Sequence, residues 1–158
     1  RKERLSLGAL VRESLQELQP QLQQAEMALS QVLPEDDAIS VIRADPLRMR
    51  QIIANLVGNA LRHAASGHWL EVEVRSTRDA QGHVWVELLV SDAGPGLPQE
   101  LRAHPFRRFA MAPGRRKREG SGLGLSIVQA LTELQGGVAH AESSSRGGAR
   151  FRLRFAPA

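Results

Sequence analysis

The stretch "DPLRMRQIIANLVGNALRHA", residues 45–64, predicts the central helix of this chain. Asp45 is a typical N-cap residue and Pro46 a typical first helical residue, so the start of the helix is well marked. Apolar residues then recur at helical spacing and form one broad face, which must pack against other elements. That face consists of Ile52, Ile53, Leu56, Val57, Ala60 and Leu61.

A polar stripe runs down the same helix. Arg48, Asn55, Asn59 and Arg62 follow one another at spacings of seven, four and three residues, so they share one side. Such a stripe can be the solvated side of an amphipathic helix, but asparagine is a poor helix former and the chain has no other asparagine. An amide oxygen is a suitable Mg²⁺ ligand beside phosphates and water, and Arg62 can meet a phosphate. The stripe therefore predicts either a solvated face or a metal and phosphate site.

The segments on either side have helical and strand patterns in turn. We expect one broken helix or two short ones over 7–32, with a bend or break at Pro20, and a mixed sheet packed on the helices. The predicted fold class is α+β, a two-layer α/β sandwich. The other expected elements are a strand at 38–45, a hairpin of 69–76 and 83–92, a helix at 123–137, and a second hairpin within 138–156 whose Phe151, Leu153 and Phe155 face one side.

Composition limits the class of protein. The 158 residues suffice for one domain with a core, and the 42% hydrophobic content excludes wholesale disorder. The absence of cysteine excludes disulfides, thiolate catalysis and cysteine metal sites. No apolar run reaches the roughly 20 residues of a membrane span and the N-terminus lacks a signal-peptide pattern, so we expect a soluble intracellular piece. The net charge of +4 and the run "RRKRE", residues 115–119, would also suit a nucleic-acid binder.

A second motif, "SDAGPG" at residues 91–96, follows an apolar strand. An aspartate at a strand end with glycines after it is very often only a turn. Asp92 could instead be a buried acceptor for an exocyclic amine such as that of adenine. Gly94 and Gly96 would then let the backbone come close to the ligand.

A third motif, "GSGLGLSIV" at residues 120–128, places Gly120, Gly122 and Gly124 at alternate positions ahead of a helix. Unobstructed backbone N–H groups and the helix dipole together make an anion site, where a triphosphate could lie. A flexible hinge at a helix start would explain one glycine easily and three less well.

In this order, the motifs resemble those of the catalytic ATP-binding domain of bacterial two-component sensor histidine kinases. These domains have the Bergerat fold and belong to the GHKL superfamily, which is shared with gyrase, a heat-shock chaperone and mismatch-repair proteins. The resemblance covers 45–155: "NLVGNA" is similar to the N box, "DAGPG" to the first glycine box, "PFRRF" to the F box and "GSGLGLSIV" to the second glycine box. It implies a single domain over 1–158, with a leading helical segment at 1–33 and a mobile ATP lid at 97–119.

The resemblance also implies roles for single residues. Asn59 would ligate Mg²⁺ with Asn55 beside the metal and phosphates, Asp92 would receive the adenine amine, and Arg62 and Arg108 would meet phosphate. Asn55, Asn59, Arg62 and Arg108 form the expected catalytic set. The expected ATP-binding residues are Asn55, Asn59, Arg62, His63, Asp92, Gly94, Gly96, Arg108, Gly120, Ser121, Gly122, Leu123, Gly124 and Leu125.

Asn55 stands where the hydrolytic members of the superfamily carry a glutamate that activates water. An amide cannot accept that proton, so we expect transfer to a better nucleophile, which in histidine kinases is a histidine on a separate helical hairpin. We therefore expect this fragment to bind Mg-ATP but neither to phosphorylate itself nor to hydrolyse ATP quickly. The five histidines are His63, His68, His83, His104 and His140, and none of them begins the family's H-[ED]-x-x-x-P pattern. His63 either lines the pocket or is a surface residue.

Three departures from the family pattern carry predictions. Ala103 stands where the F box usually has its first phenylalanine, which predicts a loosely packed lid. Ala149 replaces a threonine that helps to bridge Asp92 and adenine through water, which predicts weaker affinity. The basic run 115–119 is either a solvated charge run or a group of side chains that swings onto the γ-phosphate.

The expected partners follow from the resemblance: the acceptor histidine domain of the parent kinase and a downstream response regulator, with no nucleic acid. The fragment would be a monomeric cytoplasmic domain of a parent anchored in the bacterial inner membrane. Two other classes compete. An ATP-binding regulatory module without transfer activity would keep the same motifs. A nucleic-acid-binding domain would explain the charge but would leave Asn55, Asn59 and Asp92 unexplained, and the chain has few aromatic residues for base stacking.

Overall fold

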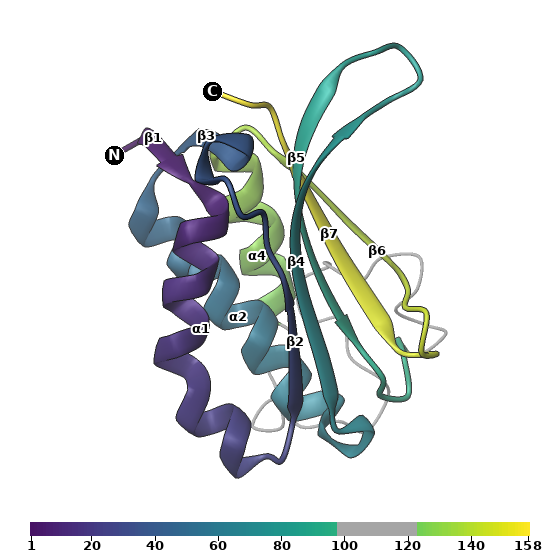
Figure 1. Cartoon of the computed structure of the whole chain (residues 1–158). Coiled ribbons are helices and arrows are strands. Elements are labelled where there is room, and N and C mark those ends of the chain that lie inside the picture. Colours follow the sequence, from purple (N-terminus) through teal and green to yellow (C-terminus); the bar gives the residue numbers. More distant parts are fainter. Residues whose placement is uncertain (98–122) are drawn as a thin grey trace.

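The fold consists of two layers, a five-stranded sheet and helices packed on one of its faces (Figure 1). The computed structural model describes residues 1–97 and 123–158. Within these residues the helices on the sheet are α1 (Leu7–Gln24), α2 (Pro46–His63) and α4 (Leu123–Leu134), and the opposite face of the sheet is open. The predicted α+β two-layer sandwich is confirmed. No helix in the described ranges is both long and apolar enough to cross a membrane.

The sheet is mixed, with strand order β2-β4-β5-β7-β6. Its edge strand β2 pairs in parallel with β4, and the other neighbours are antiparallel. Both predicted hairpins are confirmed, because β4 pairs with β5 and β6 pairs with β7. The strands are β2 (Ala28–Val32), β4 (Trp69–Arg78), β5 (Val84–Asp92), β6 (Val138–Ser143) and β7 (Ala149–Phe155).

The start of α2 is built as the sequence predicts. The Asp45 carboxylate accepts a hydrogen bond from the Leu47 N–H at 3.0 Å, and Pro46 is the first residue of the helix. The backbone N–H of Asp45 donates to the side chain of Gln135, just beyond α4, at 2.8 Å. This end of α2 is therefore tied both to its own cap and to the end of the neighbouring helix.

The leading segment differs from the expected helix over 7–32 and from a purely helical 1–33. The helix α1 continues through Pro20 as far as Gln24, and Glu26 then adopts a left-handed backbone (φ 55°) that turns the chain into β2. Residues 28–32 form an edge strand because the parallel pairing with β4 provides backbone hydrogen-bond partners. Ahead of α1, β1 (Glu3–Ser6) pairs with β3 (Val41–Ala44), which lies within the predicted strand 38–45, while 37–40 form the 3-10 turn η1 (Asp37–Ser40).

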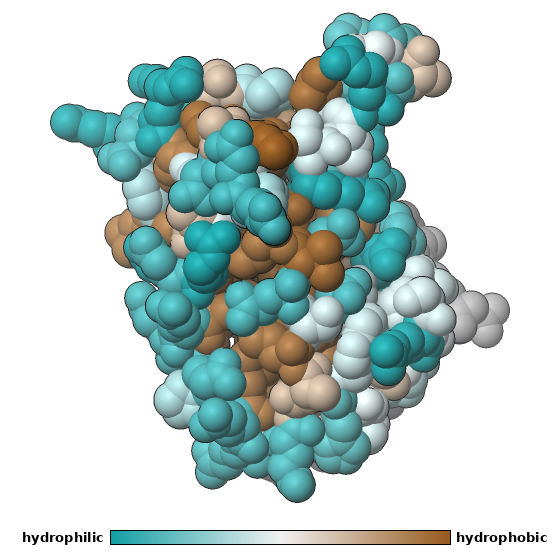
Figure 2. Space-filling view, in the orientation of Figure 1, coloured by the Kyte–Doolittle hydropathy of each residue, from teal (hydrophilic) through white to brown (hydrophobic). Residues whose placement is uncertain are grey.

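The core lies between the helices and the inner face of the sheet. Phe151, Leu153 and Phe155 of β7 are almost completely buried there, as predicted, and the apolar face of α2 packs opposite them. Each such side chain contributes roughly 1.5–3 kcal/mol when it is fully buried. Figure 2 shows apolar surface along the seam between α1 and the sheet, framed by hydrophilic side chains.

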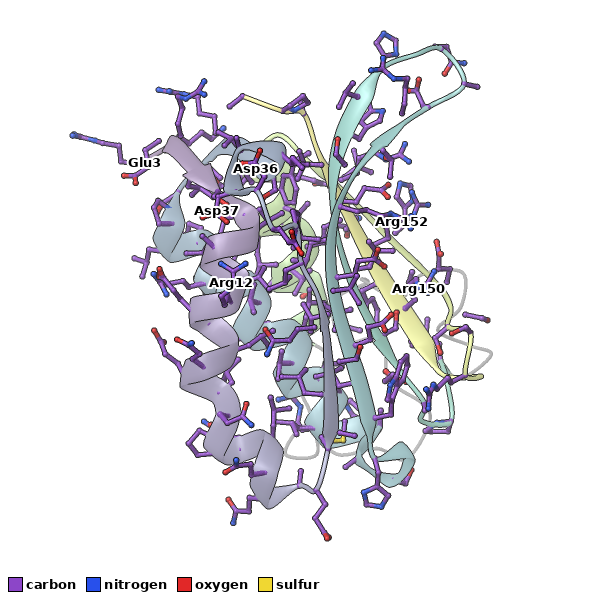
Figure 3. All side chains as sticks on the ribbon, viewed as in Figure 1. Glu3, Arg12, Asp36, Asp37, Arg150 and Arg152 are labelled. Atoms are coloured by element: carbon purple, nitrogen blue, oxygen red, sulfur yellow. The ribbon has the colours of Figure 1, made fainter. Side chains whose placement is uncertain are left out.

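In the part of the chain that the structure describes, the outer face of the sheet carries charged side chains and no helix. Arg150 and Arg152 of β7 point away from the helices (Figure 3). The carboxylate of Glu87 on β5 is only 1% exposed because arginine side chains surround it. Its ion-pair partners lie at 3.0–3.2 Å: Arg75, Arg152 and Arg154.

Candidate functional site

The two asparagines of the polar stripe lie on α2 at the side of its buried face. Asn55 and Asn59 are both half-buried, next to the buried residues Leu56 and Ala60. Neither side-chain amide is hydrogen-bonded to another residue in the described part of the chain. Both amides are therefore available to a ligand on this side of the helix.

The side chain of Arg62 lies between α2 and the start of α4. Its guanidinium lies over two glycines, since a Cβ added at Gly58 would be 3.3 Å from one of its nitrogens, and a Cβ added at Gly124 would be 3.4 Å from the other. Gly124 is in the first turn of α4, and the dipole of a helix favours an anion at this end. The fold therefore places a guanidinium beside a helix N-terminus, next to the two asparagines on α2.

Asp92 is the last residue of β5 and is 5% exposed. Its Oδ1 accepts hydrogen bonds from the backbone N–H of Gly94 at 3.1 Å and of Ala149 at 3.0 Å. Among the described residues, none donates to Oδ2. The carboxylate is thus anchored through one oxygen, and the other oxygen can accept a hydrogen bond from a ligand.

Two glycines, Gly67 and Gly94, allow the loop after Asp92 to lie directly against the end of α2. A Cβ added at Gly94 would lie 2.6 Å from the Cβ of Ala64, and a Cβ at Gly67 would overlap the carbonyl group of Ala93. Contacts of this kind are too short for any side chain. Gly96 has a φ of +80°, a conformation that favours glycine. Gly67, in the 3-10 turn η2 (Ala65–Gly67), was not predicted from the sequence, and its only signal is the short run "ASGH".

Ser144 in the β6–β7 turn is a further residue that sequence reasoning missed. It is 7% exposed, and its hydroxyl donates to the backbone carbonyl of Asp92 at 2.5 Å. Three serines in a row precede the glycines of this turn, and nothing in the sequence distinguishes the middle one. A cavity of about 190 Å³ lies between this turn and Pro95, Gly96 and Leu97.

The structure therefore brings Asn55, Asn59, Arg62, Gly124 and the Asp92 loop to the same end of the helical layer. His63 is the last residue of α2 and is exposed, and Leu125 packs against the core. Of Leu123, the structure describes only the backbone, as the first residue of α4. The other predicted features lie outside the described residues: Ala103, Arg108, Gly120, Ser121, Gly122, the basic run 115–119, and the lid apart from Leu97.

Comparison with known proteins identifies relatives of this chain. Residues 44–158 match the family described as "Histidine kinase-, DNA gyrase B-, and HSP90-like ATPase". The chain is 42% identical, over 114 residues, to the signal transduction histidine-protein kinase AfsQ2 of Streptomyces coelicolor. That match covers 72% of this chain and 20% of the relative, so the chain spans about a fifth of that protein.

Solved structures show the same fold. The ATP-binding domain of PrrB from Mycobacterium tuberculosis superposes with a TM-score of 0.74 at 25% identity, covering 99% of this chain and 98% of that one. Full-length ShkA in complex with AMPPNP superposes with a TM-score of 0.72 at 28% identity, covering 99% of this chain and 32% of that one. The chain belongs to the histidine kinase-, DNA gyrase B- and HSP90-like ATPase family, and within it to the catalytic ATPase domains of histidine kinases.

Proposed function

We propose that this domain binds Mg-ATP and donates its γ-phosphate to a histidine on a separate phosphoacceptor domain of the parent kinase. The observation that carries the proposal is the environment of Asp92. Its carboxylate is buried and held by two backbone N–H groups through Oδ1, and its other oxygen is available to a ligand. A buried carboxylate held in this way suits recognition of an exocyclic amine such as that of adenine.

The phosphates would extend from this point toward α2 and α4. Arg62 lies against Gly124 at the start of α4, where a guanidinium and a helix N-terminus together favour phosphate oxygens. Arg108 and the glycines from Gly120 to Gly124 complete this part of the proposal by resemblance to the family. ShkA was solved with AMPPNP, an ATP analogue, which supports ATP as the ligand here.

The residues on α2 fit a magnesium ion. Mg²⁺ prefers oxygen ligands and usually keeps waters while it takes one or two protein ligands plus phosphates. The amide oxygen of Asn59 is half-buried and uncommitted among the described residues, and Asn55 lies one turn away. Asn59 would therefore hold the metal, which would neutralise phosphate charge when it is bound.

Asn55 favours transfer over hydrolysis. Its amide cannot act as a general base toward water, so the nucleophile must come from elsewhere. The proposed nucleophile is the imidazole nitrogen of an acceptor histidine, which would attack the γ-phosphorus while the β–γ bond breaks and ADP leaves. We further propose that a response regulator receives the phosphoryl group, because the relatives include signal transduction histidine kinases. By resemblance to the family, we also propose that the parent is anchored in the bacterial inner membrane.

A nucleic-acid partner is not part of this proposal. The arginines of the outer sheet face are paired with carboxylates, since Glu87 takes three of them and Glu142 pairs with Arg150 and Arg152. Because four arginines share only these two carboxylates, the face keeps some positive charge, so a salt-dependent DNA shift assay is the direct test, and we expect no shift.

Titration calorimetry with Mg-ATP tests the binding step, and incubation with a purified acceptor domain and radiolabelled ATP tests the transfer step. We expect saturable binding, label on the acceptor domain, no label on this domain and slow phosphate release. Absence of binding would contradict the proposal, and so would steady phosphate release at ordinary ATPase rates. Binding without label on the acceptor would indicate a regulatory module instead.

A further inference from the structure

We propose that Ser144 is a positioning residue of the nucleotide site. Its hydroxyl holds the β6–β7 turn against the end of β5 and so fixes the carboxylate of Asp92 in the orientation that receives the adenine amine. The inference rests on the proposed role of Asp92 and adds a residue that acts through it.

The hydroxyl of Ser144 makes every hydrogen bond that a serine hydroxyl can make. It donates to the carbonyl oxygen of Asp92 at 2.5 Å, and it accepts from the backbone N–H of Gly148 at 3.1 Å and of Arg146 at 3.2 Å. A serine hydroxyl has one donor and two acceptor sites, so all three are satisfied by backbone groups. A buried group with this pattern joins two segments of chain that would otherwise carry unpaired polar atoms.

The β6–β7 turn also contacts the side chain of Asp92. Within it, the N–H of Ser144 donates to the Gly148 carbonyl at 2.8 Å, and the N–H of Gly147 donates to the Ser144 carbonyl at 3.2 Å. Ala149, which follows Gly148, donates its N–H to Asp92 Oδ1 at 3.0 Å. Ser144 therefore grips the backbone of Asp92 while the turn that it shapes grips the carboxylate, which directs Oδ2 to the ligand.

There is no room for a side chain between the β6–β7 turn and Asp92. A Cβ added at Gly148 would overlap both the carboxylate and the carbonyl of Asp92, so the turn meets Asp92 as bare backbone. Hydrogen bonds, and not apolar contacts, must therefore determine how the turn and the strand end fit together. The neighbouring Ser143 and Ser145 are exposed. They carry the same hydroxyl group but do not make this contact, so they are suitable control positions.

The proposal predicts a loss that depends on the adenine amine. Ser144→Ala leaves the Asp92 carbonyl and the Gly148 N–H without their partner, and we expect about tenfold weaker Mg-ATP binding. Purine riboside 5′-triphosphate, which has hydrogen in place of the amine, does not use Asp92 Oδ2, and its affinity should change less than about twofold. A merely structural defect would weaken both ligands equally.

The test compares Ser144→Ala with the matched control Ser145→Ala and with Ser144→Thr, which retains the hydroxyl. Calorimetry with both nucleotides should show the selective loss in Ser144→Ala alone. Equal weakening of both ligands, or unchanged ATP affinity, would overturn the proposal.

A second measurement needs no nucleotide and separates this proposal from the function proposed above. Amide hydrogen exchange of the free domain should be faster at Gly94 and Ala149 in Ser144→Ala, because both N–H groups donate to the Asp92 carboxylate. Unchanged exchange at these two amides would overturn the role of Ser144 even if the wild type binds ATP. Failure of the wild type to bind ATP, with faster exchange in the variant, would overturn the proposed function and leave the hold of Ser144 on Asp92 supported.

Discussion

The backbone N–H of Ala149 donates to Oδ1 of Asp92 at 3.0 Å, although the two residues are 57 positions apart. The contact follows from the pairing of β5 with β7, which brings the start of one strand beside the end of the other. Because Ala149 contributes its backbone, the alanine that stands in place of the family's threonine keeps this hydrogen bond. What it lacks is the hydroxyl, so the predicted loss of affinity concerns a water-mediated contact to the ligand and not the hold on Asp92.

Asp92→Ala should abolish Mg-ATP binding. The change removes the proposed acceptor for the adenine amine and leaves the buried N–H of Ala149 and the half-buried N–H of Gly94 unpaired, which also costs about 1–3 kcal/mol of unfolding free energy. Calorimetry and urea unfolding measure the two effects. Asp37→Ala, an exposed aspartate on η1, serves as the control and should change neither. Retained ATP binding in Asp92→Ala would contradict the role of this carboxylate.

Asn59→Ala should remove the effect of Mg²⁺ on nucleotide affinity. In the wild type, we expect ATP to bind more tightly with Mg²⁺ than with EDTA, because Asn59 and the phosphates hold the metal together. The variant should show nearly equal affinities under the two conditions. Gln51→Ala, an exposed change on the same helix, should behave like the wild type. If Asn59→Ala keeps the full response to Mg²⁺, the metal lies elsewhere.

Gly94→Ala should destabilise the domain by about 1–3 kcal/mol, because the new methyl group would lie 2.6 Å from the Cβ of Ala64 and push the Asp92 loop away from α2. Chemical unfolding measures the loss. Gly58→Ala is the contrasting change: its methyl group meets only the flexible end of Arg62 at 3.3 Å, and alanine favours a helix by up to about 1 kcal/mol over glycine. Equal stability of the two variants would show that the loop does not pack on α2 as described.

Glu87 should make the stability of the domain depend on acid pH. Burial by itself raises the pKa of this carboxyl, but hydrogen bonds from Arg75, Arg154 and Arg152 outweigh it and lower the pKa below the ordinary 4.5. A carboxyl with a lowered folded pKa stabilises the fold fully above its ordinary pKa, and this contribution is lost as pH falls through the folded value.

Glu87→Gln should therefore be less stable than the wild type by about 1–3 kcal/mol at pH 7, and the difference should shrink below about pH 4.5. Urea unfolding at pH 7, 5, 4 and 3 measures it. Glu133→Gln, an exposed change on α4, should follow the wild type at each pH. A difference that stays constant down to pH 3 would mean that the ionised carboxylate does not stabilise the fold.

The elements with strong local signals were predictable. The helix α2 was expected from Asp45, Pro46 and its apolar spacing, and both hairpins were expected from alternating strands around short turns. The strand β2 was not, because residues 28–32 carry no strand pattern of their own and become a strand only by pairing with β4. In the same way, Pro20 predicts a bend or break in α1, and the break is absent, because packing keeps the helix continuous to Gln24.

By itself, the sequence determined the central helix, the shared side of Asn55, Asn59 and Arg62, and the position of Asp92 at a strand end. These depend on caps and periodicities that act over a few residues. Only the tertiary structure decided that Arg62 meets Gly124, that Gly67 and Gly94 let the Asp92 loop contact α2, and that Ser144 holds Asp92. Those contacts join residues that are distant in the chain, and sheet pairing and close packing alone bring them together.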